Sequence, residues 1–371
     1  MNGVVRRSCL TLLVVCAACG PKRPPEDFAP DPGLAARVQG IEMSTTVTRA
    51  CPGAVIPTSY LAVLDDGSRL PFSRTYDPKR PPALHVMFLE RTSPQAASQA
   101  DGDWVTASNS LLSLIDGFRL RVAFRFKPSV VETKVIPPSY DCGPRAFRFQ
   151  GRTGEEAGAG ADGPDVTVRL GIVRSPFYDS LIVAGIEAGD APPFYVFGDA
   201  ATMPPADWLL IETRGGRGGR GQKGTPGAKG GKGQPGCPSG DGGQGGNGGR
   251  GGQGGPGGRG GRVTIIVPRE LPFVAGLVDA ETTGGEGGPG GPGGDPGGGG
   301  DPGDVRQQGN EPCTEGKQGP SGARGEPGPD GRDGREGPRS QVITLPMREV
   351  FGPYLPAPLA ELVFEGMGRR E

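Results

Sequence analysis

The chain has very few of the residues on which most enzyme chemistry depends. Its 371 residues include one histidine, His85, and only two tryptophans. A single histidine excludes a histidine-rich metal centre, and the sequence contains no nucleophile elbow, zinc-protease or phosphate-loop motif. His85 lies in the strand-like segment "ALHVMFLE", where we expect a structural role. The sequence therefore predicts a protein that is not an enzyme and that needs no cofactor.

The chain also has no excess of charge of either sign. The 40 basic and 41 acidic residues give a formal net charge of -1, so the chain as a whole does not attract nucleic acid or an anionic surface. The arginine–glycine stretch "RGGRGGRG" is similar to RNA-binding boxes, but no aromatic residues alternate with it for base stacking. We therefore predict no nucleic-acid partner.

The one strongly hydrophobic run lies at the N-terminus and is too short to span a bilayer. Arg6 and Arg7 precede "CLTLLVVCAA", which has the order of an export signal. The segment ends in "VCAACG", which resembles a bacterial lipobox with Cys19 as the lipidated residue. That resemblance implies a signal peptide (1–18), a lipid-anchored proline-rich tether (19–37), and attachment to the bacterial outer membrane. An ordinary secretory signal cut near Ala18 is the alternative.

Alternating hydrophobic residues predict strands in the part of the chain that follows. The segment "YLAVLDDGSRLPF" predicts a hairpin around Asp66-Gly67. In "FRLRVAFRF", five apolar residues from Phe118 to Phe126 alternate with arginines, as in a half-buried strand. We expect an all-β region of one or two immunoglobulin-like sandwiches, split near Pro128 into residues 38–128 and 129–208. A long, mobile, glycine-rich hairpin loop is expected at 151–164.

Glycine, with 70 residues, is concentrated near the C-terminal end. There it occupies every third position in four runs of similar length: run 1 (215–236), run 2 (243–261), run 3 (285–303) and run 4 (316–337). A flexible linker has no reason to keep a period of three. The period is typical of the polyproline-II helix, in which such a run extends roughly 55–65 Å.

Three structures compete for residues 209–345. Run 4, "GPSGARGEPGPDGRDGREGP", resembles bacterial collagen-like sequences and would imply a trimer. Runs 2 and 3 contain mostly Gly-Gly-x triplets with little proline, and the set resembles the polyglycine-II bundles of some arthropod antifreeze proteins and phage-fibre adhesins. We favour such a bundle within one monomeric chain, because it pairs buried backbone groups without a side-chain core. Disorder is the third alternative.

The connections between the runs predict an up-and-down path. Short turns follow run 1 and run 3, whereas the strand-like segments "WLLIET", "VTIIV", "GLVDA" and "QVITLP" would meet at the opposite end as a small sheet. This path places Cys237 and Cys313 at the same end. We expect a Cys237–Cys313 bond, and a Cys51–Cys142 bond in the β region, as suits an oxidising compartment. Residues 346–371 read as a proline-rich tail.

Charge is divided between two of the runs. Run 1 and the residue before it carry six basic residues and no acid, whereas run 3 and the residue after it carry four acids and no base. We expect these two runs to be neighbours. Loose calcium contact by Asp295, Asp301 and Asp304 is a weaker alternative.

The sequence as a whole resembles collagen-like, glycine-rich bacterial surface lipoproteins over its last third. The resemblance implies a non-enzymatic envelope protein, periplasmic or surface-exposed, with a structural or adhesive role and with envelope proteins as partners. A module that binds polysaccharide through the sandwich loops or the glycine face is the alternative.

Overall fold

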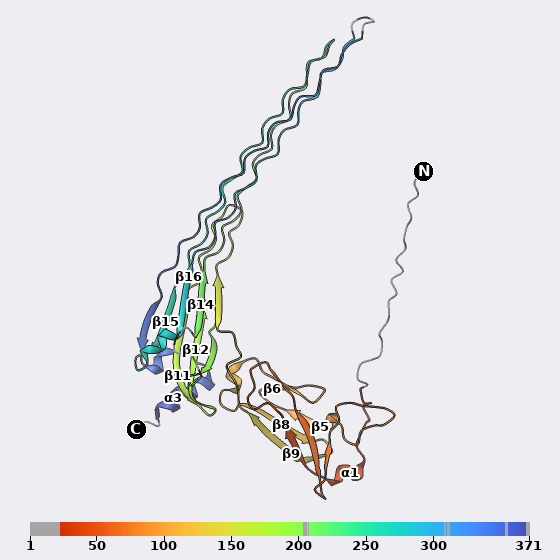
Figure 1. Ribbon diagram of the computed structural model, residues 1–371, viewed down its shortest axis with the longest axis vertical. Coiled ribbons are helices and arrows are strands. Elements are labelled where there is room, and N and C mark those ends of the chain that lie inside the picture. The colour runs from red at the N-terminus through yellow and green to blue at the C-terminus, as the bar shows by residue number, and fades with distance from the viewer. Residues whose placement is uncertain are drawn as a thin grey trace. The chain divides into compact units, whose positions relative to one another are not determined.

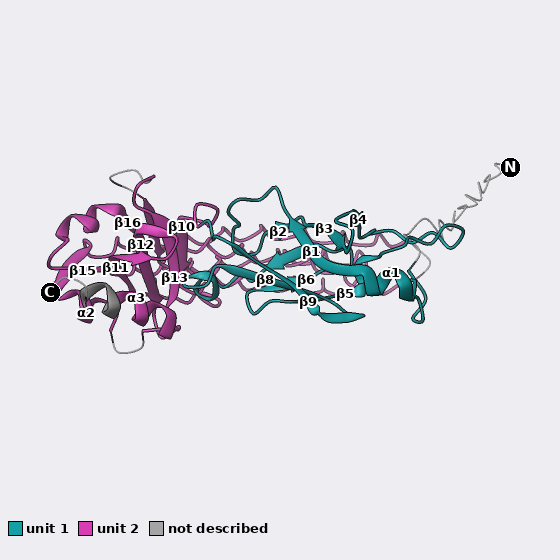
Figure 2. Cartoon of the chain, turned by 90° about the horizontal axis from the view of Figure 1, so that it is seen from below, with its two compact units in different colours: residues 1–139 teal, residues 140–371 magenta. Residues whose placement is uncertain are grey.

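The computed structural model describes residues 23–202, 206, 208–307, 309, 312–352 and 355–368. These residues are rich in strands and poor in helices, and they form two compact units, Met1–Ser139 and Tyr140–Glu371 (Figure 2). The sequence placed a boundary near Pro128. In the structure Pro128 lies inside strand β9 (Lys127–Ile136), which pairs with the preceding strand, so the division comes later.

Unit 1 contains three small antiparallel sheets around one core. The strand orders are β1-β3-β4, β2-β7-β6 and β5-β8-β9. Their bounds are β1 (Val38–Ser44), β2 (Val55–Ile56), β3 (Ser59–Leu64), β4 (Arg69–Pro71), β5 (Leu89–Thr92), β6 (Ala96–Ser98), β7 (Trp104–Thr106) and β8 (Phe118–Phe124), with 3-10 turns η1 (Val86–Phe88) and η2 (Ser110–Ser113). The core includes the buried side chains of Ile56, Tyr60, Phe88, Trp104 and Phe118.

Two predicted strand features can be compared directly with unit 1. The hairpin at Asp66-Gly67 is present as β3 and β4, and Gly67 has φ +79, a conformation that glycine adopts without strain. The apolar residues of β8 are buried as expected, but Phe126, which was expected to continue their alternation, is 47% exposed. The strand ends at Phe124, so the alternation no longer applies at Phe126.

The end of the expected tether is also folded. Helix α1 (Pro32–Arg37) begins after Asp31, whose side chain accepts a hydrogen bond from the N–H of Leu34. Phe28 packs against the core of unit 1. Residues 28–37 therefore belong to unit 1 rather than to an extended tether.

Unit 2 contains two sheets that share a hydrophobic core. One has the parallel order β10-β14-β16, and the other has the mixed order β13-β12-β11-β15-β17. The bounds are β10 (Ala146–Gln150), β11 (Val166–Ser175), β12 (Tyr178–Ala188), β13 (Phe194–Asp199), β14 (Leu209–Arg214), β15 (Val263–Pro268), β16 (Val278–Thr283) and β17 (Gln341–Leu345), with the 3-10 segment η3 (Pro272–Leu277) before β16.

The predicted cap is therefore two sheets, not one. Strands β14 and β16, which lead into runs 1 and 3, pair side by side in one sheet. Strands β15 and β17, which follow runs 2 and 4, pair in the other. The strands that lead into runs and the strands that follow runs point in opposite directions along the runs. Each parallel pair therefore contains strands of one kind only.

Part of the expected proline-rich tail is helical. Helix α2 (Met347–Val350) and helix α3 (Ala357–Gly368) follow β17. Val350, Phe351, Leu359 and Leu362 are buried. A Cβ atom added at Gly171 of β11 would come within 3.0 Å of Met347, so this glycine lets α2 approach the sheet closely.

The four glycine runs leave the strands of unit 2 and continue side by side as extended chain (Figure 1). None of their residues is assigned to a helix, and only Gly236 takes part in a β-bridge. Runs 1 and 3 lead away from the sheets, and runs 2 and 4 return to them.

Candidate functional site

Backbone hydrogen bonds at every third residue join the four runs to one another. Glycine N–H groups of run 1 donate to run 3, those of run 3 to run 2, and those of run 4 to run 3. Run 2 donates to both run 1 and run 4. The N···O distances lie between 2.7 and 3.1 Å, and the bonds continue from Gly215 at the base to Gly236 at the tip. The runs therefore satisfy their buried backbone within one chain, as buried peptide groups require.

The number of neighbours explains the two triplet types. Runs 2 and 3 are each hydrogen-bonded to three other runs, and both have two glycines in most triplets. A Cβ atom added at Gly245 or Gly293 would come closer than 3.0 Å to a neighbouring carbonyl oxygen. Runs 1 and 4 are bonded to two other runs each, and one glycine per triplet is enough over most of their length.

Residues 151–164 belong to this assembly. We name them the glycine hairpin. Its first arm donates to run 1, as from Gly154 to the Arg217 carbonyl at 2.8 Å, and its second arm donates to run 2, as from Gly160 to the Pro256 carbonyl at 2.9 Å. The expected hairpin is present, and both of its arms are hydrogen-bonded to the runs, which was not predicted from the sequence. The signal was present in the sequence, because Gly151, Gly154, Gly160 and Gly163 keep the period of three.

Run 1 and run 3 carry a column of ion pairs, which we name the charge column. Its members are Arg214 and Arg217 with Glu286, Lys223 with Asp295, Lys229 with Asp301, and Lys232 with Asp304. The three lysine pairs have N···O distances of 2.5–2.7 Å. Hydrogen bonds from Lys223 and Lys229 hold the pKa values of Asp295 and Asp301 below the usual aspartate value. Complementary charge thus lies where these two runs are neighbours.

Polar side chains cover part of the edges of runs 3 and 4. These side chains accept hydrogen bonds from backbone N–H groups that donate to no backbone carbonyl of another run. The pairs are Gly287 to Asp333, Gly290 to Asp330, Lys317 to Asp241 and Ala323 to Asn247, at 2.6–2.8 Å.

A disulfide joins the two connections at the far end of the runs. Cys237 and Cys313, the pair expected from the up-and-down path, are bonded with their Cα atoms 5.2 Å apart. Ser239 Oγ accepts a hydrogen bond from the N–H of Gly316 at 2.9 Å, which ties the same two connections together. Cys51 and Cys142 are each disulfide-bonded as well. Their pairing with each other stays a prediction.

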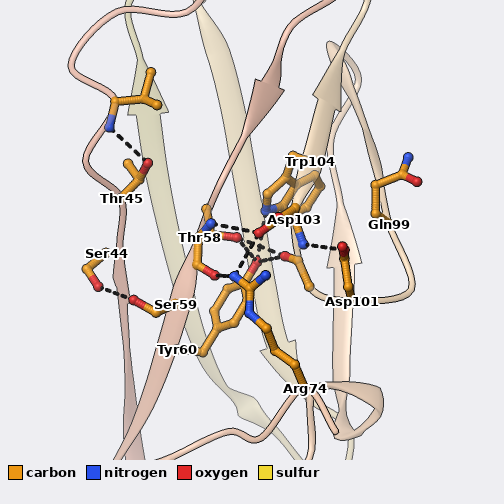
Figure 3. A network of polar contacts seen from close by, with 12 residues as sticks. Ser44, Thr45, Thr58, Ser59, Tyr60, Arg74, Gln99, Asp101, Asp103 and Trp104 are labelled. Carbon is orange, nitrogen blue, oxygen red and sulfur yellow. Dashed lines mark hydrogen bonds and ion pairs between the residues drawn. The ribbon is translucent and has the colours of Figure 1, made fainter. Parts of the chain in front are cut away.

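Unit 1 contains a polar network that the sequence did not suggest (Figure 3). The Tyr60 hydroxyl donates to the Gly102 carbonyl at 2.7 Å and accepts from Trp104 Nε1 at 2.9 Å. Arg74 donates to Asp103 at 2.7 Å and to the Thr58 carbonyl. Burial opposes ionisation of Asp103, but the hydrogen bonds from Arg74 and from the Thr58 N–H hold its pKa below the usual value.

This network holds loops of unit 1 together. Its hydrogen-bonding groups bond one another, and it links positions more than forty residues apart, such as Thr58 with Asp103. No local sequence pattern marks such a long-range set. His85 Nδ1 accepts a hydrogen bond from the N–H of Met87 at 3.2 Å at the start of η1, whereas its buried Nε2 has no hydrogen-bond partner among the described residues. Burial lowers the pKa of His85.

The remaining predicted site residues are placed as follows. Cys19 and the lipobox lie outside the described residues. Asp295, Asp301 and Asp304 each bond a lysine of run 1, so they are not gathered around a cation. Within the described part of the chain, no cluster of three or more histidine, cysteine or acidic residues is arranged to hold a metal ion.

Comparisons with known proteins return no relative. No protein-family model, curated protein or solved structure matches the chain. Among the residues that the structure describes, no helix is both long enough and apolar enough to cross a membrane.

Proposed function

We propose that runs 1–4 are polyglycine-II-type helices packed as a rigid bundle, and that this bundle is a spacer. The observation that carries the proposal is the ladder of backbone hydrogen bonds between the runs. This ladder is continuous from the strands of unit 2 to the disulfide at the tip. At about 3.1 Å per residue, run 1 would extend roughly 65 Å. The bundle would hold its tip at a fixed distance from the sheets of unit 2.

The bonding within one chain supports a monomer rather than a collagen-like trimer. In a triple helix the glycine of each run faces two other chains, whereas here each run bonds to runs of its own chain. Light scattering on the chain lacking its signal peptide should give a monomer mass. A trimer would contradict the proposal. For unit 1, three antiparallel sheets around one core are compatible with an immunoglobulin-like sandwich, which stays part of the proposal.

We further propose that the protein is a non-enzymatic lipoprotein of the bacterial outer membrane, with a structural or adhesive role. The Ala17-Ala18-Cys19 sequence and the disulfide-bonded cysteines support export and lipid attachment. Replacing Cys19 with alanine should abolish acyl labelling and release the protein from the membrane fraction. An unlabelled parent protein with unchanged fractionation would contradict the anchor.

The same Cys19→Ala strain tests the adhesive role. If the anchored spacer attaches the cell to a surface, its release should reduce attachment, and normal attachment would contradict that role. The polysaccharide-binding alternative has less support, because Trp104 and Trp208 are both buried and offer no aromatic platform to a sugar.

A further inference from the structure

The glycine hairpin covers only part of the edge between run 1 and run 2. Its second arm bonds both runs: the N–H groups of Gly216 and Gly219 donate to it at 2.7–2.8 Å, and the carbonyls of Pro256 and Arg259 accept from it at 2.8–2.9 Å. The arm reverses at Gly158, whose N–H donates to the Glu155 carbonyl, while the runs continue toward the tip (Figure 1). Beyond that point no segment among the described residues covers the same edge.

The pairing groups of this edge continue in the same register after the hairpin ends. We name them the open ladder. They have no hydrogen-bond partner among the described residues. The donors are the N–H groups of Gln222, Thr225, Ala228 and Gly231, and the acceptors are the carbonyls of Gln253, Arg250, Asn247 and Gln244. None of the four donor positions is proline, whereas proline occurs elsewhere in run 1 at Pro226 and Pro235.

The floor of the open ladder is made of glycine. Under the hairpin, a Cβ atom added at Gly255 or Gly258 of run 2 would come closer than 3.0 Å to a hairpin carbonyl. The same row continues uncovered as Gly243, Gly246, Gly249 and Gly252, of which Gly243 is exposed and the other three are half-buried. The Thr225 hydroxyl lies over this floor, 2.5 Å from where a Cβ atom at Gly249 would be.

We propose that the open ladder binds an extended segment of another polypeptide that has glycine at every third residue. The occupant would lie in line with the second arm of the hairpin and parallel to run 2. The N–H groups of its glycines would donate hydrogen bonds to carbonyls of run 2. The carbonyl of the residue that follows each glycine would accept a hydrogen bond from an N–H group of run 1. Glycine is required in the occupant because a Cβ atom at Gly160 would come closer than 3.0 Å to the Gly216 carbonyl. The mode resembles strand addition to a sheet edge, with a period of three instead of two.

The binding test uses a peptide with the sequence of residues 316–327, GKQGPSGARGEP, labelled with a fluorophore. Fluorescence polarisation should show binding to the full chain without its signal peptide. A peptide with alanine in place of its four glycines should not bind. Failure of the first peptide to bind would overturn the proposal, and so would equal binding of both peptides.

Proline variants locate the site without disturbing the bundle. Ala228→Pro with Gly231→Pro removes two ladder donors that the bundle does not use, and proline suits an extended chain of this kind. Loss of two hydrogen bonds should weaken peptide binding roughly tenfold or more at an unchanged melting temperature. The control, Gln318→Pro with Ser321→Pro, places two prolines on exposed positions of run 4 and should bind as the parent does.

Two outcomes contradict this placement. Equal loss in the ladder and control variants would show that the peptide does not recognise the open ladder. A concentration-dependent dimer that the peptide does not dissociate would show that a second copy of the chain covers this edge instead. Either result leaves the spacer proposal standing, because the bundle's own hydrogen bonds do not involve these donors.

Discussion

Two glycines of run 3 show how differently single positions in the bundle depend on glycine. A Cβ atom added at Gly291 would come closer than 3.0 Å to the Gln222 carbonyl of run 1, whereas one added at Gly298 would meet nothing within 4 Å. The backbone cannot move aside at Gly291, because its N–H also donates to the Gly252 carbonyl at 2.8 Å. Gly291 keeps the period of three that begins at Gly285, whereas Gly298 lies one residue after the periodic Gly297, at the position that Asp295 and Asp301 occupy in their triplets.

We predict opposite effects of alanine at these two sites. Gly291→Ala should destabilise unit 2 by about 1–3 kcal/mol or more, because the added methyl group overpacks the contact with run 1. Gly298→Ala should be neutral or stabilising by up to about 1 kcal/mol, because it reduces the freedom of the unfolded chain. Thermal unfolding followed by circular dichroism measures both. Equal melting temperatures of the two variants would contradict the packing described for run 3.

At the scale of elements, the turn of the glycine hairpin contains a residue whose backbone has an unfavourable positive φ. Ala157 has φ +55, and it is the one residue other than glycine with positive φ in the described part of the chain. Ala157→Gly should therefore stabilise unit 2 by about 1 kcal/mol. Ala159→Gly, in the same turn region without positive φ, should cost about 0.5–1 kcal/mol. Destabilisation by both substitutions in thermal unfolding would mean that the hairpin is not ordered as described.

The charge column gives unit 2 a dependence on pH. Asp295 and Asp301 have folded-state pKa values below the ordinary value of 3.8, so their ion pairs stabilise the fold above that pH. The contribution is lost as the pH falls through the lower folded-state pKa values. Replacing both residues with asparagine should flatten the acid side of the melting-temperature profile, whereas Asp190→Asn, at an exposed site without an ion pair, should not. High salt should weaken the effect in the parent.

How far the sequence predicts these elements depends on whether the signal is periodic. The alternation in β8 and the four glycine runs are readable because each repeats over short distances, and the hairpin at Gly67 is readable from its local Asp-Gly turn. The separation of the cap into two sheets and the Tyr60–Trp104 network depend on contacts between distant residues, which no local pattern records. The glycine hairpin was predicted as a hairpin loop, but its pairing with runs 1 and 2 was not, because two triplets per arm are a weak periodic signal.

At the scale of the whole molecule, the disulfide at the tip links two cysteines that are 76 residues apart in the sequence. The loop between Cys237 and Cys313 includes the return to the sheets through run 2 and the second passage through run 3. Replacing both cysteines with serine should reduce the free energy of unfolding by about 4 kcal/mol in the chain-entropy model. Chemical denaturation measures this change. A loss well under 1 kcal/mol would mean that the tip is already fixed by its hydrogen bonds.

The pairing of the remaining two cysteines, Cys51 and Cys142, is tested by mapping. Peptide mapping under non-reducing conditions should recover Cys51 linked to Cys142 and Cys237 linked to Cys313. A link between Cys142 and Cys237 would contradict the pairing.

The distance between two labels on run 4 tests the central claim, that the glycine runs form a rigid bundle. Ser321 and Glu336 are exposed, and spin labels attached there through non-natural amino acids leave the native cysteines untouched. Fifteen residues at about 3.1 Å each predict a narrow distribution of electron–electron distances centred near 46 Å. A flexible glycine-rich chain of the same length would give a broad distribution around 21 Å, and that result would contradict the account.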